Sequence, residues 1–337
     1  MTGSGLEPDL RAYGELLAAI AGTRVLVAGD VMLDHYIWGD SLRISPEAPV
    51  PVVEVERDTF AGGGAANVSL NLAALGVGTL LCGRTGADEA GERLGEILRA
   101  EGVGRVPGPA APQTLEKTRV MARNQQLCRI DREAPREGYA LGGVGLEDDL
   151  ATAMEDCQAV IASDYGKGAI APAWLEWARG EVGRRGIPLA LDPKPALSDP
   201  VPGLDLLTPN RTEALRLAGL PERPERGAFP VAEVCRRIRQ RWQPRFLVVT
   251  LGPEGMVVSV GPGEEEVIPT YARSVFDVSG AGDTVVAALT AALAAGTDLR
   301  TAACLANRAA GVVVGKVGTA TATPGEILAH RERHPAP

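Results

Sequence analysis

Aromatic residues are scarce in this 337-residue chain, because Phe, Trp and Tyr together make up only 4% of it. Proteins that hold single-stranded nucleic acid commonly stack bases on such rings, so we expect no base-stacking surface. The formal net charge of −9 also argues against a general affinity for polyanions. We therefore expect no nucleic-acid partner, although this charge is compatible with a local basic pocket.

Histidine and paired cysteines are also lacking. The three histidines form no cluster, which supports neither a zinc site nor a Ser-His-Asp triad. The five cysteines are odd in number and none stands in a Cys-X-X-Cys spacing, so we expect no disulfide framework and no thiolate zinc site. Buried free thiols in a reducing compartment are the simpler expectation.

No long hydrophobic run is present. The longest apolar stretch, residues 285–295, contains a threonine and falls far short of the ~20 residues that span a bilayer. The N-terminus lacks a basic segment followed by an apolar run, so no signal peptide is visible. We expect a soluble cytoplasmic protein with no membrane partner.

What the chain does contain is an alternation of apolar strands and helices, with 45% hydrophobic residues, enough for a large core. Continuous apolar strands that alternate with helices indicate a mostly parallel sheet covered on both faces, here as one α/β domain over 1–337. Strands are expected at 24–30, 79–82, 159–164, 187–192, 204–207 and 246–250, and helices at 65–75, 89–100, 172–185, from about 212, 231–242, 281–295 and 301–314.

Two stretches break this alternation, at about 35–57 and 117–131. Residues 36–39 with 50–55, and 118–122 with 127–131, have the pattern of antiparallel strand pairs inserted between α/β units. A small sheet beside a larger one suggests a lid, a subunit interface or both. Residues 50–55 alternate apolar and polar side chains, and such an exposed face needs a cover. We therefore expect a homodimer formed through the lid.

The sequence Gly280-Ala281-Gly282-Asp283 opens a long apolar helix. Glycines there allow backbone N–H groups to point outward at a helix N-terminus, a geometry that binds anions. Asp283 is then either a cap of this helix or a base that takes a proton from an attacking hydroxyl beside a phosphate. The glycines on both sides of Ala281 exceed what a cap needs, so they favour the base.

A second glycine cluster, at 61–67, also opens a helix. It is not a dinucleotide fingerprint, because Asn67 stands where the third glycine should be. Gly62 and Gly63 would allow close approach of a polyhydroxyl ligand, and Asn67 offers a donor and an acceptor. A tight loop without a ligand is the alternative.

Polar side chains follow several of the expected strands. Asp34, Asp164, Asp192 and Lys194 all stand at or beyond carboxyl ends, where open parallel sheets bind ligands. One such carboxylate could be an ordinary cap, but several at one edge favour a polar site for sugar hydroxyls. Residues 210–213, Asn-Arg-Thr-Glu, start a further helix and could form a capping box or orient hydrated Mg²⁺ beside phosphates.

These motifs resemble those of the ribokinase-like (PfkB) sugar kinases, which carry a glycine pair near the N-terminus and a Gly-Ala-Gly-Asp box near the C-terminus. The resemblance runs from about residue 24 to 328. Residues 29–34, 43–53, 123–127, 163–165, 207–210 and 309–318 resemble, more specifically, the kinases of D-glycero-β-D-manno-heptose 7-phosphate. It implies a three-layer α/β fold with a β lid, and ATP-dependent phosphorylation of the anomeric O1 to the 1,7-bisphosphate.

The resemblance also implies residue roles. Asp283 would be the base, and the backbone of Gly280, Ala281 and Gly282 would form an anion hole for the transferred phosphate. ATP and Mg²⁺ would be held by Asn210, Arg211, Thr212, Glu213, Thr250, Gly252, Gly255 and Asn307. The sugar would be held by Asp34, Gly62, Gly63, Asn67, Asn124, Asp164, Asp192 and Lys194. A monovalent cation, K⁺, would be held by Asp277, Val313, Lys316 and Gly318.

A 7-phosphate would bring about two negative charges to an acidic protein, so local cations must hold it. Arg43, Lys117, Arg119 and Arg123 all lie in the lid segments, and arginine matches phosphate geometry by paired hydrogen bonds. Each could equally be a solvated surface charge. We expect at least one of them to bind the phosphate.

Two alternatives stay open. A kinase of another sugar phosphate, such as fructose 6-phosphate, would use the same chemistry, and a non-catalytic sugar-binding regulator would have no need of Asp283. The chain ends at Pro337 without the nucleotidyltransferase domain of the bifunctional heptose enzymes, so we expect it to stop at the bisphosphate. The sequence leaves the downstream pathway open.

Overall fold

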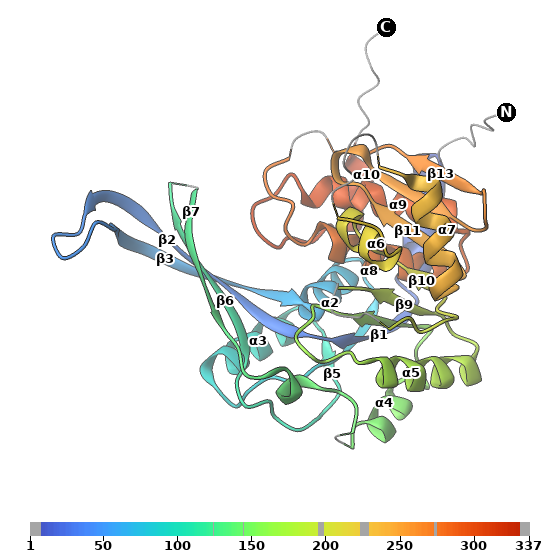
Figure 1. Ribbon diagram of the computed structural model, residues 1–337, viewed down its shortest axis with the longest axis horizontal. Coiled ribbons are helices and arrows are strands. Elements are labelled where there is room, and N and C mark those ends of the chain that lie inside the picture. The colour runs from blue at the N-terminus through green and yellow to red at the C-terminus, as the bar shows by residue number, and fades with distance from the viewer. Residues whose placement is uncertain are drawn as a thin grey trace, which may run out of the picture.

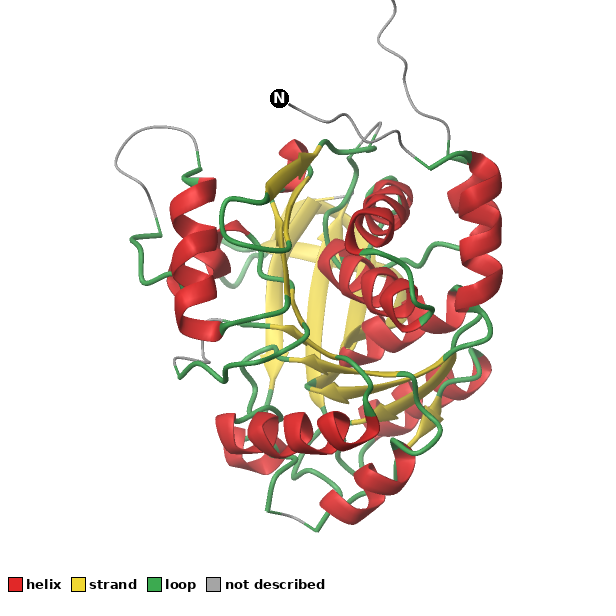
Figure 2. Ribbon diagram, turned by 90° about the vertical axis from the view of Figure 1, so that its right-hand side faces the viewer, coloured by secondary structure: helices red, strands yellow, loops and turns green. Residues whose placement is uncertain are grey.

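The structure is a computed structural model that describes residues 8–330 apart from 124, 144, 195–198, 223–228 and 273–274. A nine-stranded sheet, in the order β13-β12-β11-β10-β9-β8-β1-β4-β5, forms the body of the molecule, with helices on both faces (Figures 1 and 2). The strands are β1 (Arg24–Gly29), β4 (Gly78–Cys82), β5 (Gly104–Arg105), β8 (Ala159–Ser163), β9 (Leu189–Asp192), β10 (Leu206–Leu207), β11 (Phe246–Thr250), β12 (Met256–Ser259) and β13 (Glu265–Ile268).

The helices form two layers with the sheet between them, which is the three-layer α/β/α arrangement expected from the sequence. Helices α1, α2, α3, α8 and α9 pack on one face of the sheet, and α4, α5, α6 and α7 pack on the other. The helices are α1 (Leu10–Ile20), α2 (Ala65–Ala74), α3 (Glu89–Ala100), α4 (Glu147–Ala153), α5 (Pro172–Arg185), α6 (Arg211–Leu217), α7 (Val231–Trp242), α8 (Ala281–Ala294), α9 (Leu299–Val313) and α10 (Pro324–Ala329).

The apolar strands are explained by burial on both faces. In β1, Val25 and Val27 belong to the core under α2 and α8, whereas Leu26 and Ala28 belong to the opposite core. Successive side chains of a strand point to opposite faces, so a strand covered on both sides needs an unbroken apolar run.

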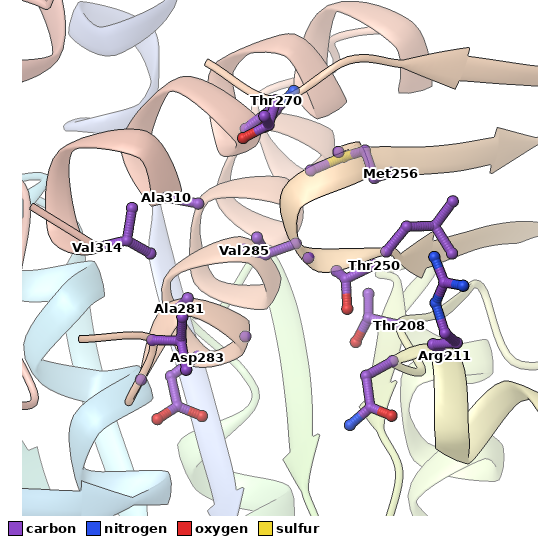
Figure 3. Close-up of a pocket in the computed structure, with 18 of the residues that line it drawn as sticks. Thr208, Arg211, Thr250, Met256, Thr270, Ala281, Asp283, Val285, Ala310 and Val314 are labelled. Carbon is purple, nitrogen blue, oxygen red and sulfur yellow. The ribbon is translucent and has the colours of Figure 1, made fainter. Parts of the chain in front are cut away.

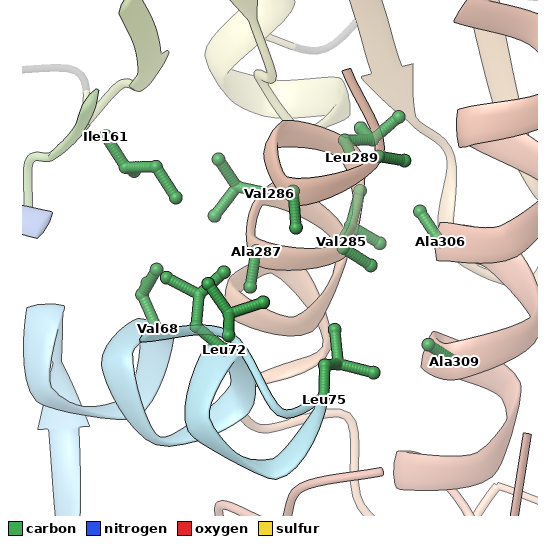
Figure 4. Close-up of a cluster of buried hydrophobic side chains, with 14 of the residues drawn as sticks. Val68, Leu72, Leu75, Ile161, Val285, Val286, Ala287, Leu289, Ala306 and Ala309 are labelled. Atoms are coloured by element: carbon green, nitrogen blue, oxygen red, sulfur yellow. The ribbon is translucent and has the colours of Figure 1, made fainter. Parts of the chain in front are cut away.

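Helix α8 lies deep in the first layer. Every residue from Asp283 to Ala292 is buried, which is why its sequence is apolar all round. Val285, Val286 and Leu289 pack against Leu72 of α2 and Ala306 of α9 in Figure 4. This packing fixes the N-terminus of α8 at the carboxyl ends of the parallel strands.

The lid is a separate four-stranded sheet in the order β3-β2-β6-β7, formed by β2 (Val31–Ile44), β3 (Pro51–Gly64), β6 (Leu115–Ala122) and β7 (Gln125–Arg132). It projects from the body as a long arm (Figure 1). The two predicted antiparallel pairs exist, and a parallel pairing of β2 with β6 joins them into one sheet. The outer arm exposes apolar side chains, with Leu42 and Ile44 69% and 63% exposed.

The structure corrects some expectations. The sheet ends in an antiparallel edge, β12 and β13, which the sequence pattern did not predict. Strand β5 and helices α1, α4 and α10 were not predicted either. The five cysteines are free, but Cys128 on the lid is exposed and not buried, because it lies on the uncovered strand β7. Over the described residues, no helix is long and apolar enough to cross a membrane.

Candidate active site

A cavity of about 590 Å³ opens between the N-terminus of α8 and the loops that follow β9, β10 and β11. Figure 3 shows Ala281 and Asp283 on one side of it and Thr208, Arg211 and Thr250 on the other. The structure thus brings together residues that lie far apart in the sequence. Its walls include Asp192, Lys194, Asn210, Arg211, Thr212, Glu213, Thr250, Gly252, Gly255, Gly280, Ala281, Gly282, Asp283 and Asn307.

The turn into α8 depends on glycine at position 280. Gly280 is the N-cap with φ of 78°, a left-handed conformation that favours glycine, and no side chain caps this helix end. A Cβ at Gly280 would also lie 2.6 Å from the amide nitrogen of Asn67. A Cβ at Gly282 would meet nothing within 4 Å, so that position faces open space on the cavity wall. No side chain therefore covers this helix end, although the Ala281 N–H donates to the Val278 carbonyl at 3.3 Å.

Asp283 is buried in the first turn of α8 and lines the cavity. Its Oδ2 accepts a hydrogen bond from Nδ2 of Asn67 at 2.6 Å, and its Oδ1 accepts one from the hydroxyl of Tyr165. Burial raises the pKa of Asp283, and these two donors partly oppose that rise. The carboxylate does not cap the helix, so the cap interpretation has no support in this geometry.

Asn67 is held firmly within α2. Asn71 donates to the backbone oxygen of Asn67 at 2.9 Å and to its side-chain oxygen at 3.3 Å. Thr284, next to Asp283, donates in turn to Asn71 at 2.8 Å. The second glycine cluster therefore leads into a helix that positions Asp283 from the side opposite to Tyr165.

Asn210 and Glu213 form a complete capping box at the start of α6. The Asn210 side chain accepts from the Glu213 N–H at 3.0 Å, and Glu213 accepts from the Asn210 N–H at 2.8 Å. The remaining Glu213 oxygen accepts from Nζ of Lys194 at 2.8 Å. The cap is thus real, and the same residues also line the cavity. On the other wall, Asn307 donates to the Pro269 carbonyl at 2.6 Å.

The two buried carboxylates after β8 and β9 differ in their surroundings. Asp192 lines the cavity and accepts from the Thr208 hydroxyl at 3.1 Å, and burial raises its pKa to about 7. Asp164 accepts from the backbone N–H groups of Gly166 and Lys194, and burial raises its pKa to about 6. Asp164 does not line the cavity and orders the two loops instead.

Asp34 lies on the lid strand β2, beside the glycine pair. Arg119 of β6 donates to Asp34 Oδ1 at 2.6 Å, and a Cβ on Gly63 would approach Asp34 Oδ2 to 2.5 Å. A Cβ on Gly62 would come within 2.8 Å of Leu70. Both glycines are thus closely packed against neighbouring side chains whether or not a ligand approaches them.

The four predicted phosphate-binding cations have different environments. Arg43 pairs with Glu54 at 3.6 Å and Arg123 with Asp40 at 2.7 Å, and both arginines are exposed on the outer arm. Lys117 forms no ion pair with any described residue, and its ammonium lies 5.6 Å from the centre of the Tyr165 ring. Burial and the neighbouring cations Lys167, Arg119 and Arg129 lower its pKa. Asn124 lies outside the described residues.

The loops proposed for a monovalent cation meet at Asp277. Its carboxylate accepts from the N–H groups of Ser279 at 2.9 Å and Gly318 at 3.0 Å. The Val313 carbonyl accepts from the Lys316 N–H at 2.9 Å, and the Lys316 ammonium pairs with Glu326. The described residues contain no group of three or more His, Cys, Asp and Glu side chains placed to hold a metal ion.

Sequence reasoning missed three residues of this site. Tyr165 bonds Asp283 and lies in segment 163–165, one of those that resemble the heptose kinases. Its position after a buried strand could have identified it. Thr208 binds Asp192 from another strand end. Thr319 follows the residue that Asp277 binds, and its buried hydroxyl has no hydrogen-bond partner among the described residues.

Comparison with known proteins agrees with this geometry. The family model described as pfkB family carbohydrate kinase matches residues 23–325. The chain is 46% identical over 323 residues to the bifunctional protein HldE of Halorhodospira halophila, covering 95% of this chain and 66% of that protein. It is 42% identical over 318 residues to HldE of Geobacter sulfurreducens, covering 93% of this chain and 64% of that protein. The chain thus spans just under two thirds of the length of these relatives.

Solved structures share the fold at low sequence identity. Ribokinase of Arabidopsis thaliana, complexed with ribose and ATP, superposes with a TM-score of 0.70 at 20% identity, covering 91% of this chain and 98% of that one. Phosphofructokinase-2 of Escherichia coli, in complex with substrates and products, gives 0.70 at 20% identity, covering 90% and 97%. These similarities establish the architecture of the chain.

Proposed function

The chain belongs to the PfkB family of carbohydrate kinases, and we propose that it phosphorylates the anomeric O1 of D-glycero-β-D-manno-heptose 7-phosphate with ATP. The observation that carries this proposal is the buried Asp283 carboxylate beside the uncapped N-terminus of α8. The similarity to the HldE proteins and the resemblance of residues 43–53 and 123–127 to heptose kinases support this choice of sugar.

The chemistry follows from the positions of these groups. Asp283 takes the proton of the attacking hydroxyl, and the N–H groups of Gly280, Ala281 and Gly282 stabilise the charge of the phosphoryl group in transfer. Phosphoryl transfer asks little covalent work of a protein, so positioning and electrostatics supply most of the rate. A carboxylate held by Asn67 and Tyr165 is already oriented before the sugar arrives.

The cavity supports ATP as the donor. Thr250, Gly252, Gly255 and Asn307 offer a wall for the nucleoside, and residues 210–213 lie at the start of α6. Asp192 and Glu213 present carboxylate oxygens to the same space, a donor type that suits Mg²⁺, which usually keeps several of its waters. Mg²⁺ would neutralise charge on the transferred phosphate.

A monovalent cation such as K⁺ fits behind the turn at residue 280. Asp277 supplies an anionic oxygen there, and the buried Thr319 hydroxyl lacks a partner in the described structure, so it is available as a further oxygen ligand. Val313, Lys316 and Gly318 would contribute through their backbones. Such an ion would supply fixed positive charge behind the anion hole.

We assign the 7-phosphate to Lys117 and Arg119. Among the four lid cations, Lys117 is half-buried and forms no ion pair with any described residue, and burial together with three further cations lowers its pKa. Several positive charges close together attract an anion. The Lys117 ammonium lies 5.6 Å from the centre of the Tyr165 ring, and the hydroxyl of the same tyrosine bonds Asp283, so Lys117 and Asp283 both adjoin one side chain. One end of the sugar would face each of them.

A kinase assay tests the proposal. ADP release is measured with heptose 7-phosphate, unphosphorylated heptose, fructose 6-phosphate and ribose, and heptose 7-phosphate should give the highest kcat/KM. Lys117→Met should lower kcat/KM for heptose 7-phosphate by about 10- to 100-fold, the worth of a hydrogen bond to a charged group. The same change should leave kcat/KM for unphosphorylated heptose nearly constant.

Arg43→Met is the matched control, because Arg43 is a lid cation that is exposed and paired on the outer arm. It should leave both values of kcat/KM within about twofold, as is usual for surface pairs. Equal kcat/KM for heptose and heptose 7-phosphate in the wild type would contradict the phosphate assignment and the choice of sugar. Preference for fructose 6-phosphate would favour the alternative kinase.

A further inference from the structure

The two donors at the Asp283 carboxylate are held in different ways. Asn67 belongs to α2 and is fixed by Asn71. Tyr165 reaches Oδ1 of Asp283 from the loop after β8, and the ammonium groups of Lys117 and Lys194 lie 5.6 Å and 4.8 Å from its ring centre. Both ammonium groups sit on flexible stems, so the tyrosine has neighbours that can move with it.

The backbone under Tyr165 is rigid. The Asp30 carboxylate accepts from the N–H groups of Tyr165 at 2.8 Å, Lys167 at 3.0 Å and Ala169 at 2.9 Å. Gly168 has φ of +114°, and a Cβ there would lie 2.2 Å from the Arg136 carbonyl oxygen. A rotation about the side-chain torsions can therefore move the Tyr165 hydroxyl away from Asp283 while the loop stays in place.

We propose that the Tyr165 hydroxyl occupies the position of the sugar's acceptor hydroxyl at Oδ1 of Asp283 when no sugar is bound, and that the entering sugar displaces it. The inference rests on the proposed function, in which Asp283 is the base. Asn67 keeps Oδ2 oriented throughout. Oδ1 is the oxygen left for the substrate, and an O–H donor already sits on it.

The reason for such a device is competition with water. In the kinase reaction, a sugar oxygen forms a bond to the γ-phosphorus, and the hydroxyl proton passes to Asp283. The bond from that phosphorus to the bridging oxygen of ADP breaks, and ADP leaves with the electron pair. Water at Oδ1 could undergo the same steps and hydrolyse ATP to ADP and phosphate. A tyrosine hydroxyl on Oδ1 excludes that water and lowers the basicity of the carboxylate.

The variant Tyr165→Phe tests this directly, since it keeps the ring between the two lysines and removes the hydroxyl. ADP release from ATP and Mg²⁺ is measured without sugar, and the variant should exceed the wild type by about tenfold or more, the effect of one hydrogen bond to a charged group. In the presence of saturating sugar, kcat should stay within about threefold, because the hydroxyl has already left in that complex. Tyr165→Leu is the second variant and should show the same rise.

Two controls separate this effect from a general loss of packing in the protein. Tyr139→Phe removes a buried tyrosine hydroxyl that bonds the Ala134 N–H outside the cavity, and its sugar-free rate should equal that of the wild type. The double variant Tyr165→Phe with Asp283→Asn should return to background, because the extra hydrolysis needs the base.

The outcomes also separate this inference from the proposed function. If no sugar phosphate stimulates ADP release by the wild type, the proposed function fails. If the wild type is stimulated but neither Tyr165 variant hydrolyses ATP faster without sugar, the displacement is wrong and the kinase assignment stands. A tenfold fall in sugar-dependent kcat with unchanged hydrolysis would likewise overturn it, because Tyr165 would then act with the sugar bound.

Discussion

Replacing Asp283 by asparagine separates a base from an ordinary helix-terminal acid. Asparagine keeps the size of the side chain but cannot take a proton at neutral pH. Loss of a positioned base costs on the order of 10²–10⁴ in rate, equivalent to about 3–5 kcal/mol. We expect a loss of kcat in that range with heptose 7-phosphate, and ATP affinity close to that of the wild type.

The contacts of Asp283 predict a small effect of Asp283→Asn on stability. The asparagine oxygen can still accept from Tyr165, but its NH₂ group would face the NH₂ group of Asn67, which Asn71 holds in place. One lost hydrogen bond costs about 1 kcal/mol, and removal of a buried charge offsets part of that cost. The melting temperature should therefore change by no more than about 3 °C.

Asp298 provides the matched control for this substitution. It is the N-cap of α9 and accepts from the Thr301 N–H at 3.0 Å. Asparagine caps as well as aspartate, so Asp298→Asn should leave kcat and melting temperature almost unchanged. The assay is ADP release, with the wild type and both variants compared at the same pH. An Asp283→Asn enzyme within threefold of wild-type kcat would refute the role of Asp283 as base.

Two further predictions concern the lid and the buried Asp192. The exposed apolar side chains of the arm should pair with a second copy, so light scattering at micromolar concentration should give a dimer. The double variant Leu42→Asp with Ile44→Asp should be a monomer. The control Val260→Asp changes an exposed valine outside the lid and should remain a dimer. A monomeric wild type would contradict this interface. Burial raises the Asp192 pKa from 3.8 to about 7, so the folded state binds that proton more tightly than the unfolded state does. As pH rises from about 4 to 7, the free energy of unfolding of the wild type should fall relative to that of Asp192→Asn, as measured by denaturant unfolding. If the two free energies of unfolding depend on pH in the same way over that range, Asp192 does not titrate as described.

The helices and central strands were predictable because their signals are local. The predicted bounds of α3, α5, α7 and β11 match the structure, since caps, apolar periodicity and flanking turns all lie within each segment. The antiparallel edge was not predicted. Strands β12 and β13 are four residues each and include polar positions, so no periodic pattern is long enough to identify them.

The site was predictable in its components and not in its contacts. Residues 280–283 could be recognised because a glycine-rich turn before an apolar helix has one geometry. The parallel pairing of Asp34 with Lys117 joins strands far apart in the sequence, as does the bond from Tyr165 to Asp283. Neither leaves a local pattern, since such contacts arise from packing of whole layers. The sequence therefore identified Asp283 as the candidate base and could not identify Tyr165 as its hydrogen-bond partner.

The charges of the cavity are an argument for a divalent cation beside the proposed donor. Asp192, Glu213 and Asp283 line the same space, whereas Lys194 and Arg211 are the cations on its described walls. Lys194 is already bonded to Glu213, and Arg211 is paired with Glu254 at 2.6 Å. The N-terminus of α8 adds only about half a positive charge. A triphosphate brought into this setting without a metal ion would meet net repulsion, so the acidic walls themselves support Mg²⁺ as the companion of ATP.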